Sequence, residues 1–334
     1  MKLFSLLAAV FGLGVIAALV AHFGAGSVSG SLAAVGWSGF GAICLIHLGL
    51  VAVMGMAWGA LLPDAPFWVP IWGRLVRDAG SELLPLSQVG GYVLGARAVT
   101  VAGVAGTSAA ASTIVDITLE LLAQLAYTAL ALSWLLHLRP DAAIATPVAI
   151  GLAVAGLLAA VFVGVQHHGF DLLDRFVKML GRDWANRTAV NAAALHAALV
   201  DTYRRRARVW SSFLLHLACW VASTLEAWVA LRLAGASLGF ATVLVIESLL
   251  YATRSMAFAV PNAVGVQEAA YIFLGANFGL TPELALALSL LKRARDLAIG
   301  LPALLAWQLL ESGHLWRRGG SAGRPVTSQG SGSK

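Results

Sequence analysis

Long apolar runs without a charged residue are the feature that most restricts how this chain can fold. Three such runs cover residues 3–24, 38–62 and 143–166, and a fourth, 209–231, contains one acid, Glu226. A helix of about 20 apolar residues crosses the roughly 30 Å of hydrocarbon in a bilayer. Of the 334 residues, 59% are hydrophobic and only 11% are charged, which excludes a soluble globule and a disordered segment. The pattern predicts an all-α polytopic membrane protein.

Two other apolar stretches, residues 66–105 and 238–280, are interrupted by glycine, proline and charged residues. Such stretches predict broken or re-entrant helices, whose freed backbone groups are tolerated in a membrane only where they are buried in protein or line a cavity. Each is followed by a long stretch with a charged stripe, residues 112–136 and 282–310. We expect these to be helices that do not face lipid all round.

Basic residues predict the orientation, because loops on the cytoplasmic side carry an excess of Lys and Arg. Arg74 and Arg77 follow the second run, residues 167–208 are rich in Lys and Arg, and the tail carries three arginines. Placing these regions inside puts both termini in the cytoplasm. Residues 167–208 are then a basic connector with an interfacial helix near 188–203, between transmembrane halves 1–166 and 209–312, and residues 313–334 are predicted to be disordered.

The two halves share a spacing. Pro85, with Gly90 and Gly91 after it, precedes Asp116 by 31 residues and Glu120 by 35; Pro261, with Gly265 after it, precedes Lys292 by 31 and Asp296 by 35. The predicted spans place the two sets in opposite orientations. We interpret this as an inverted-topology repeat, which in many transporters places a site near the midplane of the membrane. The alternative is two unrelated helices with proline kinks.

Eleven charged residues lie within the apolar segments, and a lone charge at the bilayer centre costs at least about 2.5–3.5 kcal/mol. On residues 112–136 the polar face includes Asp116 and Glu120, and on 282–310 it includes Lys292, Arg293 and Asp296, with Arg295 beside it. One face is acidic and the other mainly basic, so we expect them to meet between the halves around a hydrated cavity. Arg97 and Glu268, next to the predicted breaks, are further cavity candidates. A purely structural cluster of ion pairs remains the alternative.

Signatures of known enzyme sites are missing from the sequence. It contains no GxSxG, HExxH, Walker A or GxGxxG motif. Asp116-x-x-x-Glu120 is similar to one acidic pair of intramembrane prenyl-transferring enzymes, but the matching helix carries Lys292 and Arg293 instead of a second pair. The two cysteines lie far apart within separate apolar runs, which excludes a disulfide scaffold or zinc site. We therefore predict no metal and no cofactor.

Several motifs resemble those of a known family. The stretch from Val260 to Ala270, which reads VPNAVGVQEAA, and the KRARD sequence at 292–296 resemble the membrane region of lysylphosphatidylglycerol synthases and their flippase-like relatives. The first half, with YVLGARA at 92–98 and the run through Glu120, looks most like the hopanoid-associated HpnL type. The resemblance implies translocation of a lipid across the bacterial inner membrane. It assigns Pro261, Gly265 and Glu268 to the signature turn and Arg293 to the basic position of the next helix.

Together these observations predict a lipid translocase, moving a hopanoid or an aminoacyl-phospholipid through a charged cavity. Acids would bind a cationic or hydroxyl-rich headgroup, basic residues would hold its phosphate, and Arg97 and Glu268 would gate from opposite sides. The expected partners are membrane lipids and proteins of lipid synthesis. We expect no binding of nucleic acid. An intramembrane lipid-modifying enzyme or an accessory scaffold remain alternatives. The predicted translocation residues are Arg97, Asp116, Glu120, Glu268, Lys292, Arg293, Arg295 and Asp296, and the predicted hinges are Pro85, Gly90, Gly91, Pro261 and Gly265.

Overall fold

The computed structural model describes residues 25–84, 87–141, 143–179, 182–257 and 260–321. Every regular element within these ranges is a helix, which confirms the predicted all-α class. The expected span 3–24 and the predicted hinge Pro85 lie outside the described residues.

Four of the described helices are long and apolar enough to cross a membrane. The spans are Leu32–Ala60 within α2 (Ala25–Ala60), Gly106–Leu138 (α5), Ala145–Gln166 within α6 (Ala145–Met179) and Arg206–Leu233 (α8). Those in α2, α6 and α8 confirm three predicted runs. The fourth is α5, which is apolar enough to span although it contains Asp116 and Glu120. The chain is therefore a multi-pass membrane protein.

Short helices lie between the long ones. Residues 66–105 form α3 (Trp68–Leu83) and α4 (Ser87–Val101), and residues 238–280 form α9 (Phe240–Met256), a 3-10 turn at Pro261–Ala263 and α10 (Val266–Ala276). The helix after the second pair is α11 (Pro282–Ser321). We call α2–α5 the N-terminal half and α8–α11 the C-terminal half. In each half the helices follow one another in the order long, short, short, long. That the two halves are inverted relative to each other stays a prediction.

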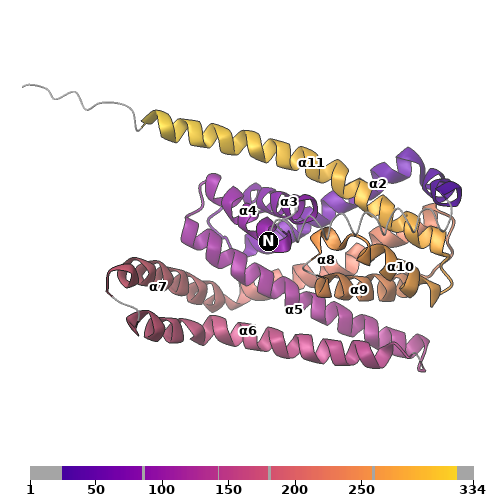
Figure 1. Ribbon diagram of the computed structural model, residues 1–334, viewed down its shortest axis with the longest axis horizontal. Helices are drawn as coiled ribbons and strands as arrows, with labels where there is room; N and C mark the ends of the chain where they lie inside the picture. Colours follow the sequence, from indigo (N-terminus) through magenta and orange to yellow (C-terminus); the bar gives the residue numbers. More distant parts are fainter. Residues whose placement is uncertain (1–24, 85–86, 142, 180–181, 258–259, 322–334) are drawn as a thin grey trace, which may run out of the picture.

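The connector between the halves forms a helical pair on one side of the molecule. Figure 1 shows α6 and α7 (Arg182–Arg204) side by side, with α11 along the opposite side. Leu195 and Leu199 of α7 pack against α5, while Arg204, Arg205 and Arg206 are exposed. The side chains of α6 between Ile150 and Val165 expose a broad apolar face, as expected where a helix meets lipid.

Small residues bring α2 and α3 close together. A Cβ atom on Gly55 would lie 2.5 Å from the Ile71 Cα atom, and one on Gly59 would lie 3.0 Å from Pro70. These distances leave room only for glycine at Gly55. The contact holds α3 against α2 along the face that carries the polar residues of the site.

Two expectations about the chain were wrong. Arg74 and Arg77 do not belong to a cytoplasmic loop, because both are buried within α3 and paired with acids, so they carry no information on orientation. The predicted disordered tail is helical at its start, because α11 continues to Ser321 without an interruption after residue 312. Residues 322–334 lie outside the described part of the chain.

Candidate functional site

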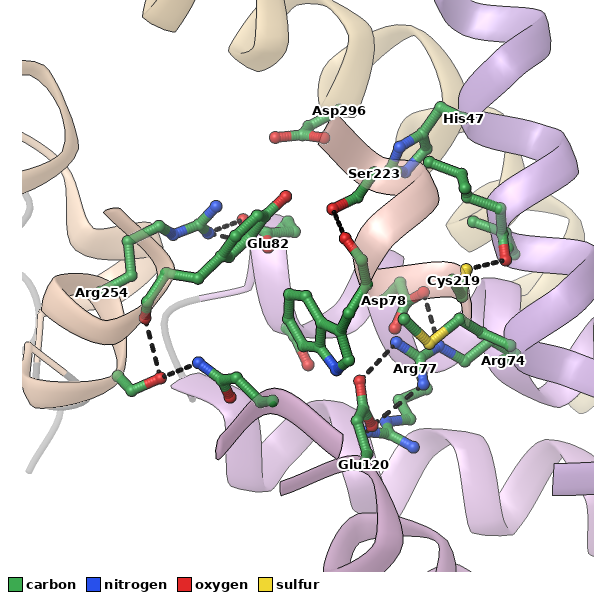
Figure 2. A pocket seen from close by; sticks show the side chains of 18 of the residues that line it. His47, Arg74, Arg77, Asp78, Glu82, Glu120, Cys219, Ser223, Arg254 and Asp296 are labelled. Atoms are coloured by element: carbon green, nitrogen blue, oxygen red, sulfur yellow. Dashed lines mark hydrogen bonds and ion pairs between the residues drawn. The ribbon is translucent and has the colours of Figure 1, made fainter. Parts of the chain in front are cut away.

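A cavity of about 430 Å³ lies between the two halves, with side chains from α2, α3, α4, α5, α8, α9 and α11 in its wall (Figure 2). Nine of the 23 described residues that line it are charged. The arginines are Arg74, Arg77, Arg254 and Arg295, and the acids are Asp78, Glu82, Glu120, Glu226 and Asp296. His47, Tyr92, Gln124, Ser223 and Tyr251 add polar groups. Such a lining is unusual within apolar helices and marks the cavity as a candidate site.

Helix α3 presents its polar face to this cavity. Arg74, Arg77, Asp78, Ser81 and Glu82 are spaced three and four residues apart and therefore share one side of the helix. The opposite side of α3 packs through apolar residues such as Val69 and Val76. The amphipathic pattern of a short helix thus positions five cavity residues at once.

In the N-terminal half the α3 arginines neutralise the acids of α5. The Arg74 guanidinium donates two hydrogen bonds to Glu120, of 2.9 and 3.0 Å, and its Nε atom donates to Asp78 at 2.8 Å. Arg77 donates to Asp116 at 2.7 Å and also to Glu120. Parallel bonds from one guanidinium to one carboxylate are strong and directional. They fix the carboxylate of Glu120 at the cavity wall.

Two histidines connect the halves through carboxylates. The Nδ1 atom of His47 on α2 lies 3.0 Å from Glu226 on α8, and the Nε2 atom of His216 on α8 lies 2.9 Å from Asp116 on α5. His216 and Asp116 are fully buried, whereas the His47 side chain is 24% exposed and lines the cavity. The two pairs are chemically alike but differ in access to the cavity.

A further ion pair between the halves closes another side of the cavity. The Nη2 atom of Arg254 on α9 donates to both carboxylate oxygens of Glu82 on α3, at 2.9 and 3.0 Å, and to the Asn262 amide oxygen at 3.0 Å. Figure 2 shows this pair across the cavity from Glu120. Asn262 and Ala263 have positive φ angles of 49° and 45°, which few residues with a side chain adopt. The strained turn before α10 is therefore attached to α3.

Helix α11 supplies the remaining charged wall. Arg295 donates to Glu226 and, through Nε and Nη2, to the Oδ1 atom of Asp296 at 3.1 and 2.5 Å. All three nitrogens of its guanidinium are therefore occupied by carboxylates. Arg295 is buried and neutralised by the acids on both sides of it.

A second charged cluster lies within the C-terminal half, outside the cavity lining. Lys292 pairs with Glu247 at 2.5 Å, and Tyr271 donates to the same carboxylate at 2.5 Å. Arg293 donates to Glu268 at 2.5 Å, and Glu268 also accepts a hydrogen bond from the Gly265 backbone N–H at 2.8 Å. Because both acids are fully buried and satisfied, this cluster fastens α9, α10 and α11 together.

The predicted translocation residues therefore separate into groups. Glu120, Arg295 and Asp296 line the cavity, and Asp116 lies directly behind it, bonded to Arg77. Glu268, Lys292 and Arg293 belong to the second cluster, and Arg97 pairs with Glu311 at 2.8 Å without lining the cavity. Of the predicted hinges, Gly265 has a positive φ of 83° and directly precedes α10, Pro261 begins the preceding turn, and Gly90 and Gly91 lie inside α4.

The expectation that the acidic face of α5 meets the basic face of α11 was wrong. The acids of α5 pair with α3 and α8, and the basic residues of α11 pair with α8, α9 and α10. The physical reason is that the long side chains of Arg74 and Arg77 on α3 reach the acids of α5 and neutralise them within the same half. Each half thus neutralises most of its own charge.

Sequence reasoning missed His47, Arg74, Arg77, Asp78 and Glu82 as site residues. The periodic polar face of residues 74–82 was a usable signal, but Arg74 and Arg77 were interpreted only as cytoplasmic charges that set the orientation. His47 was interpreted as a packed core residue. Its contact with Glu226 joins positions 179 residues apart, and no local pattern reports such a contact.

Two carboxylates are the most exposed charged groups of the wall. The side chains of Asp78 and Glu82 are 27% and 28% exposed, whereas Arg254 is 17% exposed and the other charged residues of the wall are less exposed still. Among the described residues nothing donates to the Oδ1 atom of Asp78 or the Oδ2 atom of Asp296. Such oxygens accept hydrogen bonds from amines and hydroxyls. The described residues contain no group of three or more His, Cys, Asp or Glu that could hold a metal ion.

Comparison with known proteins assigns the chain to a family. Residues 5–303 match the family described as the lysylphosphatidylglycerol synthase TM region. The chain belongs to this family. Searches of curated proteins and of solved structures gave no match. Membership in the lysylphosphatidylglycerol synthase TM region indicates a membrane protein involved in lipid handling, and the match covers every residue of the cavity wall.

Proposed function

We propose that this member of the lysylphosphatidylglycerol synthase TM family is a lipid translocase of the bacterial inner membrane. The headgroup of the lipid enters the cavity while its apolar part stays in the surrounding bilayer. The observation that carries the proposal is a charged cavity of about 430 Å³ walled by membrane-spanning helices of both halves. A polar headgroup cannot cross hydrocarbon without such compensation, because unpaired polar groups there cost several kcal/mol each.

The charge of the wall favours an amine-bearing headgroup. Its described lining contains one more carboxylate than arginine, and the carboxylates of Asp78 and Glu82 are its most exposed charged groups. An ammonium group near Asp78 and Asp296 would remove this excess. An aminoacyl-phospholipid has such a group; the hydroxyls of a hopanoid could hydrogen-bond to the same oxygens but would leave the charge unbalanced. We therefore favour the aminoacyl-phospholipid.

Arg254 is the best placed cation for the phosphate of such a lipid. Only its Nη2 atom donates to described residues, so Nε and Nη1 are available. The earlier candidates Lys292, Arg293 and Arg295 are each neutralised by buried acids. In the proposed complex Arg254 contacts the phosphate, and Asp78, Glu82 and Asp296 contact the amine.

The surroundings of Asp116 and Glu120 support transport over the alternative of a metal-dependent lipid-modifying enzyme. Both oxygens of Asp116 contact His216 and Arg77, and both oxygens of Glu120 accept from arginines. Each of these oxygens already has a cationic or imidazole partner, which Mg²⁺ would have to displace. A scaffold, in turn, would have a closed interface between its halves, whereas here the interface contains a cavity.

Reconstituted vesicles test the proposal. The probe is lysylphosphatidylglycerol with a fluorescent nitrobenzoxadiazole acyl chain, and its movement is followed by dithionite quenching of the outer leaflet. Wild type should transport it, and Asp78→Asn should slow transport about tenfold or more, because a hydrogen bond to a charged group contributes about 1.5–3 kcal/mol. The matched control Asp201→Asn alters an exposed acid of α7 and should change nothing.

Three results would contradict the proposal. Wild-type vesicles that move the probe no faster than protein-free vesicles would exclude transport of this lipid. Equal transport in wild type and Asp78→Asn would place the headgroup elsewhere. A new lipid product detected by mass spectrometry would support the enzyme instead.

A further inference from the structure

His47 occupies an unusual position for an ionisable residue. It lies near the middle of the membrane span Leu32–Ala60, and its Nδ1 atom contacts Glu226 of the other half at 3.0 Å. The imidazole is partly exposed and borders the main cavity and a small adjoining pocket. The proposed function above gives it no role.

The charges that face His47 come from every helix packed against it. Glu226 lies on α8, Arg295 and Asp296 on α11, and Asp78 and Glu82 on α3. The same cavity is also lined by Glu120 of α5, by Arg74 and Arg77 of α3, and by Arg254 of α9, and these arginines pair with Glu120, Asp116 and Glu82. Arg295 is shared between Glu226 and Asp296. With a neutral imidazole, the group formed by His47, Glu226, Arg295 and Asp296 carries one uncompensated negative charge. One bound proton makes this group neutral.

A net negative charge in a low-dielectric wall is costly unless a cation neutralises it. Imidazole is the side chain that ordinarily changes its charge between pH 5 and 8, so a proton can supply this cation at His47. The ammonium group of a lipid in the same cavity would supply it equally well. A proton and a cationic headgroup therefore compete for the same excess charge.

We propose that His47 and Glu226 form a proton-binding site that couples lipid movement to a proton gradient, by exchange of one proton for one cationic headgroup. The inference rests on the proposed function and adds its energy source. Because the pair joins α2 to α8, its protonation changes a contact between the two halves at the step where the cavity is emptied. The exchange of one positive charge for another moves no net charge across the membrane.

The pair His216 and Asp116 provides an internal comparison. It also joins the halves, but both side chains are fully buried, and the second nitrogen of His216 faces the Met54 sulfur at 3.3 Å. Because neither side chain is exposed to the cavity, a proton has no route to this pair, and a headgroup in the cavity cannot compete with that proton. We assign it to holding Arg77 and α5 in place.

Proton release on lipid binding tests the site without requiring transport. Unlabelled lysylphosphatidylglycerol is added to detergent-solubilised full-length protein in weak buffer near pH 6.5, and the pH change is recorded. Wild type should release a proton, and His47→Gln should release none. Glutamine keeps a donor toward Glu226 but cannot take up a proton. The control His137→Gln replaces an exposed histidine at the end of α5 and should behave as wild type.

Vesicles with an imposed pH gradient test the coupling. For a one-to-one exchange, one pH unit should shift the ratio of the labelled lipid between leaflets about tenfold, which corresponds to about 1.4 kcal/mol. His47→Gln should move the lipid down its own gradient without this shift. Equal proton release, or an equal shift, in wild type and His47→Gln would overturn the inference. So would a wild type that moves lipid but ignores the gradient. A wild type that moves no lipid contradicts the proposed function, and the release measurement still decides whether His47 binds the proton.

Discussion

Replacing Arg77 by methionine tests whether the charges of the N-terminal half are buried or hydrated. Arg77 is 3% exposed, donates to Asp116 at 2.7 Å and to Glu120, and its guanidinium carbon lies 4.3 Å from the centre of the Tyr92 ring. Methionine keeps an unbranched apolar stem but lacks the guanidinium, so it leaves Asp116 with His216 alone and Glu120 with Arg74 alone. Removing one partner of a buried ion pair costs about 3–5 kcal/mol. The equilibrium constant of unfolding should therefore rise by two to nearly four powers of ten.

The assay is unfolding by sodium dodecyl sulfate from detergent micelles, followed by circular dichroism. Arg205→Met is the matched control, because Arg205 forms an exposed pair with Asp201, worth about 0–1 kcal/mol. Glu120→Gln should cost less free energy in the Arg77→Met background than in wild type, since it removes a carboxylate that has already lost a partner. Equal costs for Arg77→Met and Arg205→Met would contradict this expectation and show that water screens the cluster.

Two glycines give further predictions in the same assay. A Cβ atom on Gly91 would lie 2.5 Å from the Arg77 carbonyl oxygen and against Ser81, so Gly91→Ala should destabilise the protein by about 1–3 kcal/mol. Its control is Gly156→Ala in α6, which has open space around it and should stabilise the protein by about 0.5–1 kcal/mol. Gly265→Ala forces alanine to φ 83° before α10 and should cost about 1–2 kcal/mol. Gly239→Ala, before α9 at φ −70°, should have a much smaller effect, and equal effects of the two would contradict the strain at Gly265.

The membrane spans were predictable because hydropathy is a local property. A run such as 143–166 must be helical in a bilayer, since only internal hydrogen bonds satisfy its backbone there. The stretches 66–105 and 238–280 each contain two short helices, and their interruptions by glycine, proline and charge were visible in the sequence. The charged stripes of α5 and α11 followed from spacing alone, and three of their predicted residues line the cavity.

The partners of those charges could not be predicted in the same way. Glu120 was a site candidate, but its arginines come from α3, where they had been interpreted only as charges that set the orientation. Lys292 and Arg293 matched the expected stripe, yet they contact acids of α9 and α10 instead of the cavity. Spacing identifies which residues share a face and does not identify what that face meets.

Hydropathy and residue spacing are sufficient to place this chain in a membrane, to make it helical, and to show that its apolar segments carry more charge than lipid tolerates. Helix packing determines which of those charges are buried in ion pairs, which face a cavity, and that His47 meets Glu226 across the two halves. The physical reason is the distance along the chain over which each property is decided. Helix formation in lipid is decided within about 20 residues, whereas the neutralisation of a buried charge depends on side chains that only the packing of distant helices brings within 3 Å.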